Sequence, residues 1–124
     1  MTGREIYKGA LALLFETEQT AGDYNTFALP LLNILLPELL GVNNQLRSIQ
    51  GKEEMPAAPL LSSLEDDLEY EEPLCRAALP FGLAAKLLFD DNDNQKISYL
   101  NAAYVNAVNA LDKVTPEQVK DVYQ

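Results

Sequence analysis

Residues 78–93, ALPFGLAAKLLFDDND, decide the fold of this chain, together with the stretch YLNAAY at residues 99–104. The first stretch is an apolar helix pattern, and its buried stripe continues the spacing of three and four residues that begins at Leu74. The acidic and amide residues at 90–94 end this helix, and Asp93 or Asn94 can cap the next one. The pattern therefore predicts two helices joined by a polar turn.

Start signals predict further helices at both ends of the chain. Thr2 and Glu5 have the spacing of a capping box, and apolar residues recur at helical spacing up to Leu14. The run Glu71-Glu72-Pro73 places acidic residues and a proline at the start of the helix described above. Residues 115–116, Thr-Pro, predict a short C-terminal helix that carries apolar residues at helical spacing.

A second helix is expected from Asp23, its candidate N-cap, towards Leu40. Pro30 should kink this helix or mark its first turn, because proline removes a backbone donor and clashes with the preceding turn. Pro37 should have the same effect further along. Gly41 is the expected C-terminal stop.

The middle of the chain, residues 41–70, is expected to be irregular and to be acidic at its end. Residues 41–59 lack helical periodicity, and Leu60–Tyr70 is expected to be a loop with a possible short turn. The sequence therefore predicts an all-α fold in a single domain, residues 1–124. This fold is a small bundle of four main helices plus a short C-terminal helix, with a long irregular middle segment.

Composition agrees with a helical globular domain. Hydrophobic residues make up 48% of the chain, and tryptophan is absent, so aliphatic side chains must build the core. Leucine and alanine are strong helix formers. The predicted core consists of Ile6, Leu13, Leu31, Leu35, Leu74, Phe81, Leu88, Ile97, Leu100, Tyr104 and Leu111.

The formal net charge of −10 limits the partners that the chain can bind. It repels nucleic-acid phosphates and anionic lipids alike, so we expect no sequence-specific nucleic-acid binding and no membrane association. The most apolar window, Phe27–Leu40, is shorter than a membrane span and contains two prolines and Glu38. It predicts a core helix. The first residues also lack the pattern of a signal peptide.

Residue types argue against catalysis. The chain contains no histidine, which excludes Cys–His and Ser–His catalysis and histidine-ligated metals. Cys75 is the single cysteine, expected to be a buried thiol in an intracellular protein. Neither register of residues 90–101 or 91–102 has the glycine and glutamate of an EF-hand loop. We expect no enzyme activity, no cofactor and no metal.

Two groups of residues are candidates for an interface. An acidic segment places six carboxylates within eight residues, and it could face a basic partner or line a channel through which DNA slides. Tyr99 and Tyr123 lie off the apolar stripes and could serve as interface or as ordinary surface residues. The candidate interface residues are Glu65, Asp66, Asp67, Glu69, Glu71, Glu72, Tyr99 and Tyr123.

Several of these patterns together resemble the head–tail connector (adaptor) proteins of tailed phages and prophages. The resemblance lies in the opening helix at 2–14, in LLNILL at 31–36 and above all in LPFGLAA at 79–85 with its acidic turn. It implies a structural virion protein that docks on the portal protein, contacts neighbouring neck and tail proteins, and forms a homo-oligomeric ring extending the DNA channel. The implied location is the virion, or the bacterial host cytoplasm during assembly.

A second interpretation remains open. The chain could be an acidic, non-enzymatic binding module of prophage origin, such as a regulator or a mimic of DNA charge. Self-association separates the two interpretations, because a connector forms rings whereas a DNA mimic acts as a monomer or dimer.

Overall fold

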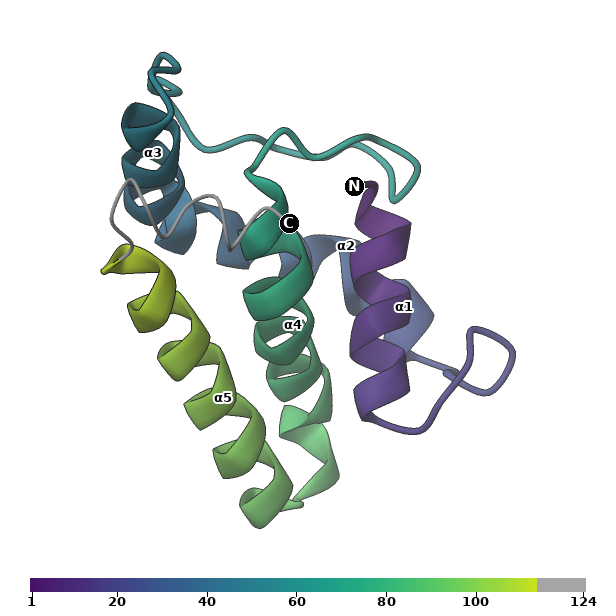
Figure 1. The fold of residues 1–124 in the computed structure, drawn as a ribbon. Coiled ribbons are helices and arrows are strands. Elements are labelled where there is room, and N and C mark those ends of the chain that lie inside the picture. Colours follow the sequence, from purple (N-terminus) through teal and green to yellow (C-terminus); the bar gives the residue numbers. More distant parts are fainter. Residues whose placement is uncertain (114–124) are drawn as a thin grey trace.

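The computed structural model describes residues 1–113, and this part of the chain is all-α, as predicted (Figure 1). The predicted helix after Thr115 lies outside the described residues. Within them no strand forms, and the one β-bridge is antiparallel, between Thr2 and Asp67. In chain order the elements are α1 (Gly3–Leu13), α2 (Tyr24–Leu35), the 3-10 turn η1 (Leu36–Leu39), α3 (Leu40–Ile49), the π-helical turn η2 (Leu74–Ala78), α4 (Leu79–Leu87), the 3-10 turn η3 (Leu88–Asp91) and α5 (Asn94–Asp112).

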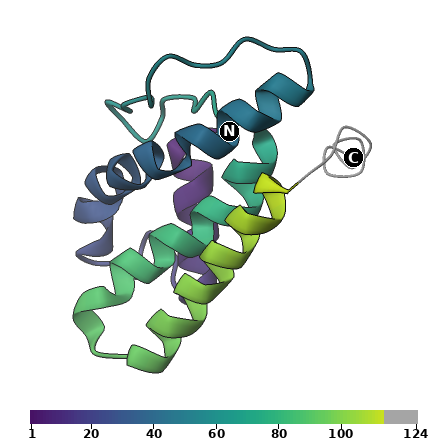
Figure 2. The same cartoon turned by 90° about the vertical axis from the view of Figure 1, so that its left-hand side faces the viewer.

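Helix α4 is the centre of the fold, and α1, α2 and α5 all pack against it (Figure 1). Most of its residues are apolar and buried, Leu79, Leu83 and Ala84 completely. A helix that is apolar on all sides must be covered on all sides. Figure 2 shows α4 and α5 as an antiparallel pair, with the run from α2 to α3 along one side of it. The stretch that decides the fold is thus the central helix.

A wide π-helical turn, η2, lies immediately before α4. Pro80 occupies the first turn of α4, where its missing N–H is tolerated. An α-helix of regular width would need that donor, so the chain widens over Leu74–Ala78 before the proline.

The second predicted helical region, from Asp23 towards Leu40, extends further along the chain than predicted. Pro37 does interrupt the helix, at η1, whereas α2 continues through Pro30. The prediction that Gly41 ends the helix was wrong, because α3 continues from Leu40 to Ile49. The end comes at Gly51, whose φ is +78° and whose N–H donates to the Ser48 carbonyl at 3.0 Å. This is the left-handed glycine of a Schellman motif.

The helical run Tyr24–Ile49 is 26 residues long and apolar enough to cross a membrane by length and composition alone. A core helix of a globular domain passes the same test. Leu32, Leu35 and Leu36 of this run are almost completely buried. Of the most apolar window of the run, 28% is buried, so the core helix expected at Phe27–Leu40 stays a prediction.

Most of the predicted core is buried. Leu13, Leu31, Phe81 and Ile97 are exceptions, since they are half-buried at the edge of the core. The predicted residues that are buried are Ile6, Leu35, Leu74, Leu88, Leu100, Tyr104 and Leu111. Large buried side chains absent from the prediction include Tyr7, Leu11, Leu32, Leu36, Leu39, Leu46, Leu68, Leu79 and Leu83.

Candidate interaction surfaces

The first half of the acidic segment, residues 65–67, is tied to the N-terminus of the chain. Glu65 is ion-paired with the Arg4 guanidinium, and Asp67 Oδ1 lies 3.3 Å from the N-terminal amine. Asp66 Oδ2 accepts hydrogen bonds from the backbone N–H groups of residues 62 and 63, at 2.8 and 3.1 Å. All three carboxylates therefore already have partners within the chain.

Glu71 is a buried member of the same segment, with 6% of its surface exposed. Its Oε1 accepts hydrogen bonds from Lys52 Nζ at 3.0 Å and from Gln50 Nε2 at 2.7 Å. Arg47 Nη1 lies 3.6 Å from Oε2. The Glu71 N–H donates to the buried Asn43 side chain at 2.7 Å. Glu71 thus fixes the segment to α3, and it does not lie on the surface where the sequence led us to expect it.

The two remaining carboxylates of the segment are exposed. Glu72 pairs with Arg76 one turn later, at 2.5 Å. Glu69 makes no hydrogen bond or ion pair among the described residues. Of the six carboxylates that the sequence singles out, one is therefore both exposed and uncompensated.

Two asparagine side chains explain why the irregular segment has a fixed path. Asn33 on α2 accepts from the Leu61 N–H and donates to the Leu61 carbonyl, both at 2.9 Å. Asn44 on α3 pairs in the same way with Met55, at 2.8 and 3.0 Å. Each amide thus satisfies both backbone groups of one residue, as a neighbouring strand would do.

The start of α1 is hydrogen-bonded to the irregular segment. Thr2 and Glu5 form the predicted capping box. The free N–H groups of Gly3 and Arg4 donate to the carbonyls of Asp66 and Leu64, at 3.2 and 2.8 Å. The irregular segment therefore supplies backbone carbonyl acceptors for N–H groups that have no partner inside the first turn of α1.

The candidate interface tyrosines are Tyr99 and Tyr123. Tyr99, on α5, is 65% exposed. Tyr123 lies outside the described residues. Tyr104, by contrast, is buried in the core as predicted.

Cys75 is buried, as predicted. Burial raises the pKa of its thiol to about 12, and its Sγ lies 3.6 Å from the Tyr70 carbonyl, to which the thiol can donate. A thiol of this kind remains protonated and unreactive at neutral pH. Within residues 1–113, no group of three or more Cys, Asp or Glu side chains is placed to hold a metal ion.

Three exposed aromatic side chains lie close to helix ends: one follows α1, one is near the start of α2 and one is in η3. Figure 1 shows the end of α1, η3 and the start of α5 towards its lower side. Phe15 is 90% and Phe89 78% exposed, and Phe27, near the start of α2, is more than half exposed. Lys96 of α5 lies over the Phe15 ring, 5.3 Å from its centroid. We call this surface the aromatic end and define it by Phe15, Phe27 and Phe89.

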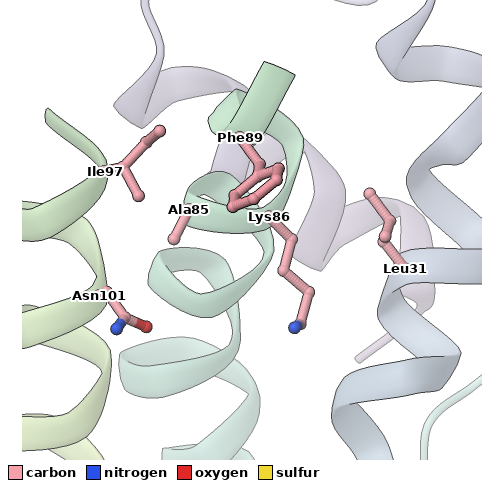
Figure 3. Close-up of a pocket in the computed structure, with 6 residues that line it drawn as sticks. All are labelled: Leu31, Ala85, Lys86, Phe89, Ile97 and Asn101. Atoms are coloured by element: carbon pink, nitrogen blue, oxygen red, sulfur yellow. The ribbon is translucent and has the colours of Figure 1, made fainter. Parts of the chain in front are cut away.

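A shallow groove of about 380 Å³ crosses α4 at the aromatic end (Figure 3). An adjoining hollow of about 270 Å³ shares Leu31, Lys86 and Phe89 with it. Together they form one depression between α2 and α5. The groove is lined by Leu31, Ala85, Lys86, Phe89, Ile97 and Asn101, and the hollow also by Tyr24, Phe27, Leu87 and Asp90.

Acidic residues border this depression. The Tyr24 hydroxyl donates a hydrogen bond to Asp91, and burial together with that bond raises the pKa of Tyr24 to about 12. Asp93 caps α5, as predicted, by accepting from the Lys96 N–H at 3.1 Å. Asp90 lies at the edge of the hollow and makes no ion pair with any other residue of the described part of the chain. The cluster of phenylalanines was missed at the sequence level, because it joins positions far apart in the chain.

Comparison with known proteins adds no relative to this picture. The chain matches no protein-family model, no curated protein and no solved structure.

Proposed function

We propose that this chain is a head–tail connector (adaptor) of a tailed phage or prophage, a structural protein that docks on the portal and forms a ring extending the DNA channel. The proposal is supported by the stretch that carries the resemblance. LPFGLAA and the acidic turn form α4 and η3, the central helix and the edge of the exposed groove. The stretch that carries the resemblance thus contributes both to the core, through α4, and to the exposed groove, through Ala85, Lys86 and Phe89.

The observation that carries the proposal is the aromatic end. Phe27 and Phe89 line the same hollow, and Phe15 lies under Lys96 of α5. Exposed apolar side chains grouped on a small domain mark a site of association with other proteins. Phe15, Phe27 and Phe89 sit at or next to helix ends, where packing of the helices fixes their positions. A part of a larger assembly needs a surface of this kind.

Charge is compatible with a channel role. A net charge of −10 lets DNA pass a protein wall without binding to it, because like charges repel. The same charge opposes self-association at low ionic strength. Added salt screens that repulsion, so salt should favour oligomers.

The test is the oligomeric state as a function of salt and of a portal protein. We expect analytical ultracentrifugation to show a monomer at low salt and larger species as the ionic strength rises. Rings should be visible by negative-stain electron microscopy when a portal protein encoded beside this chain is added. A protein that stays monomeric in every condition and competes with DNA for a basic protein would instead be the acidic binding module.

A further inference from the structure

We propose that the aromatic end is a docking surface for a protein partner that presents an apolar helix face flanked by lysine or arginine side chains. The inference names the surface by which the proposed adaptor meets a neighbour. It rests on the proposed function for the identity of that neighbour and not for the surface itself.

The first argument is the position of Phe15. Helix α1 ends in a complete Schellman motif: the Phe15 N–H donates to the Ala12 carbonyl at 3.1 Å and the Glu16 N–H to the Leu11 carbonyl at 2.9 Å. Helix α3 ends in the same motif with Gly51 at the left-handed position. In α1 that position holds Phe15, with φ +58°. A bulky residue is unfavourable there, yet its ring is directed to solvent and adds nothing to the core.

The second argument is the shape of the surface. Figure 3 shows Phe89 and Lys86 on α4 and η3 between Leu31 on one side and Ile97 on the other. The depression is open and shallow, and its walls come from three helices. Such a groove suits a few side chains of one helix face, spaced by three or four residues.

The third argument is charge. Asp90 lines the hollow, Asp91 bonds to the Tyr24 hydroxyl and Asp93 caps α5, while Glu16 directly follows Phe15 and Asp23 directly precedes Tyr24 in the chain. None of these five carboxylates is ion-paired among the described residues. Asp91 accepts the hydrogen bond of the Tyr24 hydroxyl, and Tyr24 itself lines the hollow. The basic residues are Lys86, Lys96 and Lys8, which lines the same hollow as Glu16. The balance is two negative charges in excess, five acidic against three basic.

The excess of negative charge selects the partner. Anionic lipid and nucleic acid are repelled by it. A second copy of the chain, docked with this same end, would bring two acidic rims together. A partner with basic residues around an apolar face has the complementary charge. The acidic segment at 65–72 is less suited to this role, because Arg4, Arg47, Lys52 and Arg76 already compensate most of it.

The experiment measures binding of a synthetic amphipathic helix made of leucine and lysine, labelled for fluorescence anisotropy. The same peptide with glutamate in place of lysine is the matched probe. We expect the lysine peptide to bind, the glutamate peptide not to bind, and added salt to weaken binding. Added salt should weaken binding of the peptide but favour assembly of the ring. A failure of the docking proposal can therefore be told apart from a failure of the proposed adaptor function.

Variants locate the site. Phe89→Ala should weaken binding by at least about tenfold, as truncation of a central aromatic anchor does. The control is Leu60→Ala, which removes an equally exposed apolar side chain from the irregular segment. Asp23→Asn with Asp90→Asn should also weaken binding and reduce its salt dependence. Glu54→Gln with Glu69→Gln, which changes the net charge equally, should not.

Three results would overturn the proposal. The first is equal binding by the wild type and Phe89→Ala. The second is sedimentation of the wild type, but not of Phe89→Ala, with phosphatidylserine vesicles, which would assign the surface to a membrane. The third is a shift of the Phe15 and Phe89 amide resonances with protein concentration alone, which would assign it to a second copy.

Discussion

The ring of Tyr104 on α5 lies directly over Gly82 on α4. A Cβ atom placed on Gly82 would lie 2.8 Å from Cδ1 and 2.9 Å from Cε1 of that ring. The Tyr104 hydroxyl donates to Glu38 on η1, at 3.2 Å, and Glu38 borders a hollow along α5. Because Gly82 has no side chain, one tyrosine of α5 can pack against the central helix and bond to η1 at the same time.

Gly82→Ala should therefore destabilise the protein by about 1–3 kcal/mol, the usual cost of overpacking a core. The ring is buried and is held at its far end by Glu38, so it has little room to move. Urea unfolding measures the change.

Gly41→Ala is the matched control for that substitution. Gly41 lies inside α3, and no atom lies within 4 Å of a Cβ placed there. Replacing a helical glycine by alanine at such a position should stabilise the protein, by about 0.5–1 kcal/mol. Equal effects of the two substitutions would contradict the contact between Tyr104 and Gly82.

The parts of the fold that could be predicted are those with local signals. The capping box at Thr2 and the cap at Asp93 are formed as expected, since each needs only residues three positions away. Helix α3 was missed because Gly41 looks like a helix end and residues 43–44 look like a turn. Asn44 instead lies inside the helix and binds the backbone of Met55, a contact that no local pattern reveals.

The candidate surface shows the same limit. The acidic run at 65–72 is visible in the sequence, but the groups that neutralise it are the N-terminal amine, Arg4 and the cations around α3. Phe15, Phe27 and Phe89 are unremarkable in the sequence, and tertiary packing places Phe27 with Phe89 at one hollow and Phe15 under Lys96 of α5. A charge run can thus be read from sequence, whereas its exposure and its partners cannot.

Asn33→Ala should destabilise the protein by about 1–3 kcal/mol, because the buried backbone N–H and carbonyl of Leu61 would lose their partner. Hydrogen exchange of the Leu61 amide should become faster at the same time. Asn109→Ala, on the exposed face of α5, is the control and should change the stability by less than about 0.5 kcal/mol. Unchanged protection of Leu61 in Asn33→Ala would argue against the paired hydrogen bonds.

Glu71→Ala should cost about 1.5–3 kcal/mol, since hydrogen bonds to a charged group contribute that much when they are buried. Glu69→Ala, two residues earlier and exposed, should cost less than about 0.5 kcal/mol. Thermal or urea unfolding of the two variants compares them directly. Similar losses would mean that the acidic segment behaves as one solvated surface, contrary to the ion pairs of Glu71 with α3.

Stability should fall at alkaline pH, beginning near pH 9. Burial raises the pKa of the Cys75 thiol from 9.0 to about 12, and that of Tyr70 from 10.0 to about 12. The folded state therefore holds protons that the unfolded chain releases, so this stability is complete below pH 9 and is lost as the pH rises towards 12.

Urea unfolding between pH 8 and pH 11 tests this dependence. Cys75→Ala should remove the part of the loss between pH 9 and pH 10, where the tyrosines do not yet titrate. In the native protein at pH 8, the Cys75 thiol should react with Ellman's reagent only as fast as the protein opens. Rapid reaction without urea would contradict the buried position of this thiol.

Phe15 provides a test in which stability and binding move separately. Phe15→Gly and Phe15→Ala both remove the ring and its contact with Lys96, but glycine alone accepts φ +58° without strain. The glycine variant should therefore be more stable than the alanine variant by about 1–2 kcal/mol. Urea unfolding gives this difference.

Both Phe15 variants should bind the leucine–lysine peptide equally weakly, because binding needs the ring and not the backbone conformation. Phe15→Gly would then be more stable than Phe15→Ala without binding the peptide any better, so stability and peptide binding would be set by different properties of residue 15. If Phe15→Gly binds the peptide as tightly as the wild type, Phe15 is no part of the docking surface. If the two variants are equally stable, the left-handed conformation at the end of α1 is not maintained in solution.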